Sequence, residues 1–198
     1  MNNKVDWVGI TFFIITIITG MYNLLIGNEA KVFIAIILLV VFGINKIIFS
    51  KTFLKKSLLG YMGVMIFCFL SIYLANLFDF YSISYYDKFL HIISGVMIYF
   101  FGLIIYVNLT KNDEYKKDIF FYLFPLFFSI ALAGVWEIWE FSTDLIFGLN
   151  AQNNSLIDTM TDIICGTIGA IVSLLTVLLW KSNKKNIIIN EIIKESKS

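Results

Sequence analysis

Seven ionisable residues lie in three groups at the ends of apolar segments in the second half of the chain. They are Asp87 with His91, then Glu137, Glu140 and Asp144, then Asp158 with Asp162. Within each group the residues are three, four or seven positions apart, so each group lies on one face of a helix. Carboxylates with one imidazole suit divalent ions such as Mg²⁺, Mn²⁺, Ca²⁺, Fe²⁺ or Zn²⁺. The same side chains can also act as general acid and base, and paired carboxylates can share a proton.

The composition indicates a membrane protein. Hydrophobic residues make up 59% of the 198 residues and charged residues only 15%, and the mean hydropathy is +0.85. A soluble domain has about 45–50% apolar and about 25% charged residues, so a soluble core of this size could not bury all the apolar surface. The net charge of +1 and the absence of a basic module argue against nucleic-acid binding.

Six apolar runs are long enough to cross a bilayer, which takes about 20 helical residues. They are Trp7–Leu25, Val32–Phe49, Leu58–Phe78, Asp87–Leu109, Ile119–Phe147 and Leu156–Trp180. We therefore predict an all-α fold, a polytopic bundle of six transmembrane helices in one domain, residues 1–180, followed by a basic cytoplasmic tail, residues 181–198. The isoleucines of that tail are spaced as in a short interfacial helix, with a solvated tail as an equal alternative.

The lysines predict the orientation of the bundle. All but two of the 15 cations, every one a lysine, lie in the N-terminus, the second and fourth loops and the C-terminal tail. The other loops hold only Lys31 and Lys88. Because positively charged loops stay in the cytoplasm, both termini are predicted to be cytoplasmic and the three ionisable groups to lie on the opposite side. Lysine without arginine, together with many Ile and Asn residues, is typical of an AT-rich bacterial genome, so we expect the bacterial cytoplasmic membrane.

Counting residues places the three groups at one depth. A hydrocarbon core of about 30 Å takes about 20 helical residues. Counted from the cytoplasmic ends of the last three helices, this length reaches His91 in the first, Glu137 and Glu140 in the second and Asp162 in the third. Ionisable groups at the hydrocarbon boundary are expensive and are functional candidates by default.

Some of these residues have an ordinary structural explanation. Asp87 and Asp158 open helices, where an acidic side chain caps the helix and is favoured by its dipole, and Asp144 could be a solvated charge beside a loop. Glu137 and Glu140 lie near a helix C-terminus, where the dipole disfavours negative charge. The helix dipole therefore accounts for the first two residues and not for the two glutamates.

The cluster yields three sets of candidate residues. The candidate catalytic residues are His91, Glu137, Glu140 and Asp162. A divalent metal ion would draw its ligands from Asp87, His91, Glu137, Glu140, Asp144, Asp158 and Asp162. The candidate substrate-binding residues are Lys88, Asn150 and Gln152, the last two in a short amide-rich loop. The sequence contains no phosphate-cradling glycine loop and no nucleophile elbow.

Glycines predict how the last helices pack and where one of them ends. Gly166 and Gly169 form a small-residue face typical of close helix packing, and we expect Gly95 and Gly134 to act in the same way. Gly148 is the expected C-cap of the fifth helix.

Five short elements of the second half resemble a known family. They are Tyr86-Asp87-Lys88-Phe89-Leu90-His91, Trp136-Glu137-Ile138-Trp139-Glu140-Phe141, Gly148-Leu149-Asn150-Ala151-Gln152, Asp158-Thr159-Met160-Thr161-Asp162 and Gly169-Ala170. In this order and spacing they resemble the YjdF-like family of uncharacterised bacterial membrane proteins. The family has no assigned activity, so the resemblance implies only which residues are candidates for a functional site.

The chain is more distantly similar to VanZ-like proteins, small membrane proteins linked with glycopeptide-antibiotic resistance. Asp87, Lys88, His91, Glu140 and Asp158 would correspond to the Asp-Lys-x-x-His start, the later glutamate and the following Asp of those proteins. The chain lacks the arginine-bearing loop expected before that last Asp.

Three functions fit the cluster. The first is a metal-dependent or acid–base enzyme that acts on a membrane lipid or a lipid-linked envelope substrate. The second is a transporter or binding protein coupled to protons or cations, although no relay of ionisable groups crosses the membrane. The third is a non-catalytic membrane protein that binds lipid or a partner, with the cluster as architecture. We rank the three functions in this order.

Overall fold

The computed structural model describes residues 3–52, 54, 57–110, 118–183 and 187–197. Several lysines that predict the orientation lie outside the described residues; they are Lys55, Lys56, Lys111, Lys116, Lys117, Lys184 and Lys185. Residues 184–186 and Ser198 of the predicted tail also lie outside them. The orientation of the termini therefore stays a prediction from the sequence.

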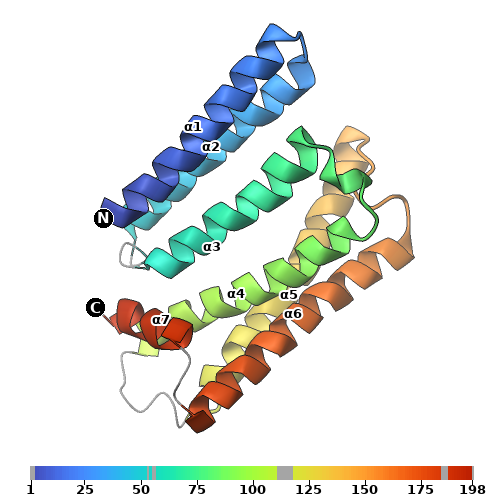
Figure 1. Ribbon diagram of the computed structural model, residues 1–198. Helices are drawn as coiled ribbons and strands as arrows, with labels where there is room; N and C mark the ends of the chain where they lie inside the picture. The colour runs from blue at the N-terminus through green and yellow to red at the C-terminus, as the bar shows by residue number, and fades with distance from the viewer. Residues whose placement is uncertain (1–2, 53, 55–56, 111–117, 184–186, 198) are drawn as a thin grey trace. The chain divides into compact units, whose positions relative to one another are not determined.

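The described part of the chain is helical and contains no strand. In chain order its elements are α1 (Asn3–Leu25), α2 (Glu29–Lys51), α3 (Leu58–Cys68), its π-helical continuation η2 (Phe69–Leu77), the short 3₁₀ helix η3 (Phe80–Ser82), α4 (Tyr86–Thr110), α5 (Phe120–Phe147), α6 (Leu156–Asn183) and α7 (Ile187–Lys197) (Figure 1). With α3 and η2 counted as one span, 6 of the helices are long and apolar enough to cross a membrane. The predicted all-α fold with six apolar spans is confirmed.

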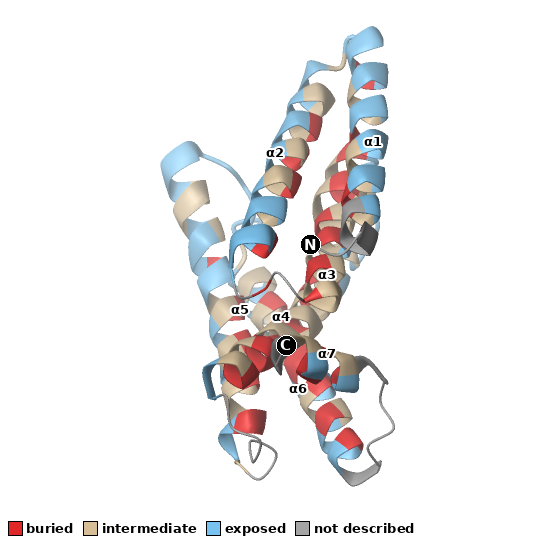
Figure 2. Ribbon diagram, turned by 90° about the vertical axis from the view of Figure 1, so that its left-hand side faces the viewer, coloured by how far each residue is buried: buried red, intermediate tan, exposed pale blue. Residues whose placement is uncertain are grey.

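The surfaces of the spanning helices suit a lipid environment. In α1 and α2, large apolar side chains are exposed, among them Ile18 at 61% and Phe33 at 64%. Figure 2 shows these faces in pale blue beside narrow buried stripes. Such surface is costly in water, whereas lipid tails solvate it. The buried stripe of α2 holds Leu38 and Phe42, both fully buried.

The chain divides into two compact units. The first is made mainly of Met1–Tyr86 and the second mainly of Asp87–Ile193. In the first unit, the hydroxyl of Thr19 in α1 lies 2.6 Å from that of Tyr73 in η2. The second unit contains the whole of the predicted ionisable cluster, so its helices position the site.

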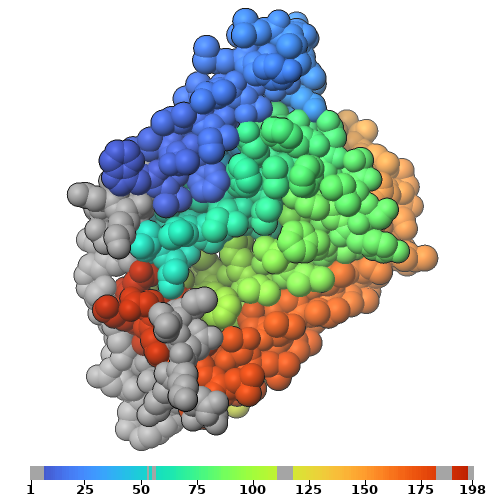
Figure 3. All heavy atoms as spheres, in the orientation of Figure 1, coloured from blue at the N-terminus to red at the C-terminus, as the bar shows by residue number. Residues whose placement is uncertain are grey.

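In the second unit, α4 and α6 approach each other so closely that their backbones touch. A Cβ atom on Gly95 would lie 2.0 Å from the carbonyl oxygen of Gly166, and one on Gly169 would lie 2.1 Å from the carbonyl oxygen of Ile92. Figure 3 shows the atoms of α4 and α6 in contact. The predicted packing role of these three glycines is confirmed. The same prediction is wrong for Gly134, because a Cβ atom there would meet no described atom within 4 Å.

The C-terminal tail forms the helix α7, as its isoleucine spacing allowed. Ile189 and Ile192 are buried, with 0% and 3% of their surface exposed. At the end of α6, the indole N–H of Trp180 donates a hydrogen bond to the side-chain oxygen of Asn190 at 2.9 Å. The apolar face of α7 is therefore covered by protein, and its place at the membrane interface stays a prediction.

We expect Gly95→Ala to destabilise the second unit, because the new methyl group would overlap the carbonyl oxygen of Gly166. Overpacking of this kind costs about 1–3 kcal/mol. Unfolding of the detergent-solubilised protein by heat, followed by circular dichroism, measures the change. Gly134→Ala is the matched control, since the methyl group meets open space there and alanine favours a helix by up to about 1 kcal/mol. Equal midpoints for the two variants would contradict the α4–α6 contact.

Candidate functional site

The first turns of α4 and α6 each carry an acidic residue, Asp87 and Asp158. At the start of α6, Ser155 accepts a hydrogen bond from the backbone N–H of Thr159 at 3.2 Å through its carbonyl oxygen. Its hydroxyl oxygen accepts one from the backbone N–H of Asp158 at 3.3 Å. Ser155 therefore caps α6, and the dipole of the helix favours the carboxylate that follows.

The glycine contact sets the distance between the two helix starts. Gly95 follows His91 by four residues, and Gly166 follows Asp162 by four, so each glycine lies one turn further along the same helix face. A Cβ atom on Gly166 would lie 3.8 Å from the carbonyl oxygen of His91. Because the backbones touch at the glycines, His91 and Asp162 are held facing each other.

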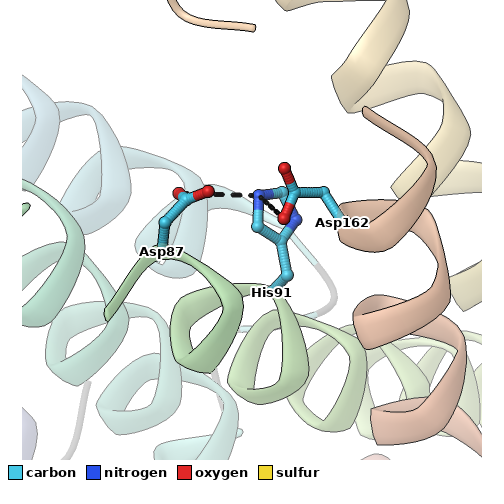
Figure 4. A group of neighbouring side chains, drawn as sticks. All are labelled: Asp87, His91 and Asp162. Carbon is cyan, nitrogen blue, oxygen red and sulfur yellow. Dashed lines mark ion pairs between the residues drawn. The ribbon is translucent and has the colours of Figure 1, made fainter. Parts of the chain in front are cut away.

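His91 lies between two carboxylates that come from two helices (Figure 4). Its Nε2 atom is 3.8 Å from Oδ1 of Asp87 and 3.7 Å from Oδ1 of Asp162. One ligand atom from each of the three residues lies within 4.8 Å of the other two. His91 and Asp162 are buried, with 8% and 2% of their surface exposed. Among the described residues, this is the group whose geometry could hold a metal ion.

Lys88 places a primary ammonium beside the same carboxylates. Its Nζ atom is 2.5 Å from Oδ1 of Asp158, 2.7 Å from Oδ1 of Asp162 and 3.4 Å from Oδ2 of Asp87. No described residue gives Asp162 Oδ1 a hydrogen bond of good geometry, so the ammonium stabilises this oxygen as an ion pair. Lys88, which the sequence suggested as a substrate-binding residue, is thus engaged by three carboxylates of the protein.

The glutamates of α5 belong to the same cluster. Glu137 and Glu140 are close enough to Asp87 and Asp162 for their charges to interact. Glu137 is buried, with 3% of its surface exposed. The side-chain amide of Gln152 donates to its Oε2 atom at 3.3 Å and to its carbonyl oxygen at 3.1 Å. Among the described residues, the Oε1 atom of Glu137 has no hydrogen-bond partner.

Glu140 is held by its own helix. The indole N–H of Trp136, one turn earlier, donates to Oε1 of Glu140 at 2.8 Å. Trp136 and Trp139 are exposed, at 52% and 62%. Both indoles therefore lie on the surface of α5, and that of Trp136 is hydrogen-bonded to Glu140.

The loop after α5 is tied down by the remaining residues of the prediction. Gly148 ends α5 in the left-handed conformation, with φ of 66°, as predicted for the C-cap. The carboxylate of Asp144 accepts hydrogen bonds from the backbone N–H groups of Ala151 at 2.8 Å and Gln152 at 3.0 Å. Asn150 accepts one from Asn154 at 2.7 Å. Asp144 and Asn150 therefore stabilise the loop by hydrogen bonds, and the loop positions Gln152 next to Glu137.

Residues 7–183 of the chain match the family described as "Predicted membrane protein (DUF2238)". The chain belongs to this family. The match is consistent with the resemblance to the YjdF-like family seen in the second half of the sequence, and its description assigns a membrane location without an activity. No curated protein matches the chain. No solved structure matches it either.

The seven predicted residues thus fall into three classes within this DUF2238 chain. Asp87, His91 and Asp162 lie within ligating distance of one another. Asp158, Glu137 and Glu140 surround them as charged neighbours. Asp144 is bound by its loop. Five carboxyl groups therefore lie around one lysine and one histidine, and such an excess of negative charge calls for protons or a cation.

Sequence reasoning missed two residues that hold the cluster together. Asn153 donates to Oδ2 of Asp158 at 2.8 Å, from a backbone with φ of 50°. An Asn in a short polar loop is a usual sign of a left-handed turn, but its partner follows only from the tertiary structure. Trp136 precedes Glu140 by four residues, so helical spacing alone could have predicted that hydrogen bond.

We expect Lys88→Met to destabilise the chain strongly, because it leaves the carboxylates of Asp158 and Asp162, 18% and 3% exposed, without their cation. Removal of one partner from a buried pair costs about 3–5 kcal/mol. Lys31→Met is the control, because its partner Asp79 is 70% exposed and an exposed pair contributes about 0–1 kcal/mol. Chemical unfolding in detergent compares the two variants. If Lys88→Met lowered the free energy of unfolding by no more than Lys31→Met does, the carboxylates of the cluster would be solvated.

Proposed function

We propose that this chain is a membrane-embedded enzyme that acts on a lipid or lipid-linked substrate at the cluster around His91. The observation that carries this proposal is the position of His91 Nε2, 3.8 Å and 3.7 Å from carboxylate oxygens of two different helices. Helix caps alone do not call for a buried imidazole between two acids. Intramembrane ionisable groups are expensive and are kept where they serve a function.

In one form of the proposal the cluster holds a divalent cation. Asp87, His91 and Asp162 would be its ligands, since their donor atoms lie within 4.8 Å of one another. Two carboxylates and one imidazole suit a divalent metal ion that is borderline between hard and soft. Three protein ligands leave a coordination position for water or substrate, as catalytic sites require. A bound ion there would supply Lewis acidity. Lys88 shares Asp162 Oδ1, at 2.7 Å, so it would have to move toward Asp158 when the ion binds.

In the other form the cluster works by proton transfer alone. His91 would accept or donate a proton at Nε2, and Asp87 and Asp162 would orient the imidazole and stabilise its charged form. Both forms use the same residues, and metal analysis separates them.

The lipid substrate is proposed from the predicted depth and orientation of the cluster. The lysine pattern predicts that the cluster lies at the outer boundary of a bacterial cytoplasmic membrane, where headgroups of lipids and lipid-linked envelope precursors are found. The likeness to VanZ-like proteins, which involves Asp87, Lys88, His91, Glu140 and Asp158, points to the cell envelope in the same way. The lysine pattern and the sequence likeness do not depend on the distances within the cluster.

The coupled transporter has less support. Beyond the cluster, residues 92–110 of α4, 120–136 of α5 and 163–180 of α6 contain no Asp, Glu, Lys, Arg or His. Protons or cations would therefore find no charged or imidazole side chain along most of these helices, whereas pumps and transporters usually contain such relays. The hypothesis that the cluster only holds the helices together is tested with the variants described below.

We expect the protein purified without chelators to carry about one divalent ion per chain, as a single three-ligand site holds. His91→Ala and Asp162→Asn should lose it, because each removes one ligand. Inductively coupled plasma mass spectrometry measures the metal. Asp79→Asn is the control, since it removes a carboxylate from the first unit. A metal content that is nil, or the same in all four proteins, would discard the metal form.

The acid–base form and the architectural reading are separated by turnover. Incubated in vesicles of bacterial polar lipids, the wild-type protein should produce a lipid species that lipid mass spectrometry detects. His91→Ala should lose this product while keeping its unfolding midpoint within a few degrees of the wild type. If no lipid changes, or if activity falls only in variants that unfold, the cluster is architecture.

The predicted orientation has its own test. We expect reporters of cytoplasmic location fused after residue 198 to be active, and a reporter inserted in the loop at Asn150 to be active only in its periplasmic form. The opposite pattern would place the cluster on the cytoplasmic side and remove the argument for an outer-leaflet substrate.

A further inference from the structure

Glu137 has a buried carboxylate oxygen that receives no hydrogen bond from the part of the chain that the structure describes. The residue is only 3% exposed, and its Oε2 atom receives the amide of Gln152 at 3.3 Å. Among the described residues, Oε1 has no hydrogen-bond partner. A buried carboxylate oxygen without a donor is costly and rare in folded proteins, so this atom points to a ligand.

Two simple occupants do not account for this atom. A proton on Oε1 would remove the charge but would leave a hydroxyl donor without an acceptor among the described residues. A metal ion needs several ligands around it, and the group of described residues that could supply them contains Asp87, His91 and Asp162 without Glu137. An N–H or O–H donor from a bound molecule fits Oε1 better.

The charge of the cluster narrows the chemistry of that donor. Glu137 and Glu140 interact with each other and with Asp87 and Asp162, so an anionic group would be repelled and a cationic one attracted. The cluster already holds one primary ammonium, that of Lys88, at 2.5 Å and 2.7 Å from Asp158 and Asp162. Lys88 thus shows that the aspartates of this cluster accommodate an R–NH₃⁺ group.

We propose that Glu137 and Glu140 bind the primary ammonium of a lipid headgroup, so that the substrate class of the site is an amine-bearing phospholipid of the phosphatidylethanolamine type. This inference rests on the proposed function, because it names the substrate of the same site. The ammonium reaches Glu140 first, since Glu140 is partly exposed beside Trp136. One N–H of the ammonium then donates to Oε1 of Glu137, the oxygen that does not receive the Gln152 amide. The exposed rings of Trp136 and Trp139 suit the membrane boundary, where such a headgroup lies.

The test measures binding of three short-chain probes to the full-length protein in a nonionic detergent. They are dihexanoyl phosphatidylethanolamine, the phosphatidylcholine that has the same charge without N–H donors, and the anionic phosphatidylglycerol. We expect the first to bind about tenfold more tightly than either of the others, the change expected from one charge-assisted hydrogen bond. Glu137→Gln and Glu140→Gln should each remove this preference, whereas Glu29→Gln in α2 should leave it intact. Isothermal titration calorimetry gives the affinities.

Several outcomes decide the proposal. Equal binding of the ethanolamine and choline lipids, or a preference that survives in monodisperse Glu137→Gln and Glu140→Gln proteins, would overturn it. If free ethanolamine bound as tightly as the lipid, a soluble amine would replace the lipid as ligand and the lipid assignment would be wrong. His91→Ala should keep the preference while losing metal or turnover. A wild-type protein that shows no preference but keeps its metal or turnover refutes only this inference. A wild-type protein that shows the preference but has neither metal nor turnover refutes only the proposed function.

Discussion

The candidate site depends on a backbone contact between α4 and α6. Gly95 and Gly169 lack the Cβ atoms that would hold the two helices apart, and Gly95 lies against the carbonyl oxygen of Gly166. Gly95 and Gly166 lie one turn beyond His91 and Asp162. A side chain at Gly95 or Gly169 would overlap the backbone of the other helix and force the two helices apart. The distances between the ionisable side chains of the cluster therefore depend on glycines, which have no functional side chain.

The contact brings together more negative charge than one lysine can neutralise. Lys88 stabilises Asp158 and Asp162 at 2.5 Å and 2.7 Å, while one buried oxygen of Glu137 receives no hydrogen bond from any residue that the structure describes. In a low-dielectric environment such an imbalance is expensive, and a bundle that served only for packing would gain stability from apolar residues there. The imbalance is the physical reason to regard the cluster as a binding site for a cation or for a substrate with a positive charge.

Much of the cluster could be predicted from the sequence because helices are local. Spacing of three and four residues placed His91 with Asp87 and Asp162 with Asp158, and residue counting put the ionisable groups at one depth. The same reasoning gave close packing at Gly95, Gly166 and Gly169 but erred at Gly134, which borders open space. A glycine in a helix shows where a neighbour can approach, and only the packing of the helices shows whether one does.

The sequence by itself determined the membrane class, the six apolar spans, the all-α fold and the residues that are too polar for their depth, because these follow from hydrophobicity and helical period. Only the tertiary structure decided which of those residues contact one another. It brings Asp87, His91 and Asp162 within ligating distance of one another. It pairs Lys88 with Asp158 and Asp162, and it places Asp144 where its carboxylate binds the loop after α5. It also places Oε1 of Glu137 where no described residue donates a hydrogen bond to it. These outcomes depend on distances between different helices, which are set by side-chain volume at their contacts and not by the spacing within any one of them.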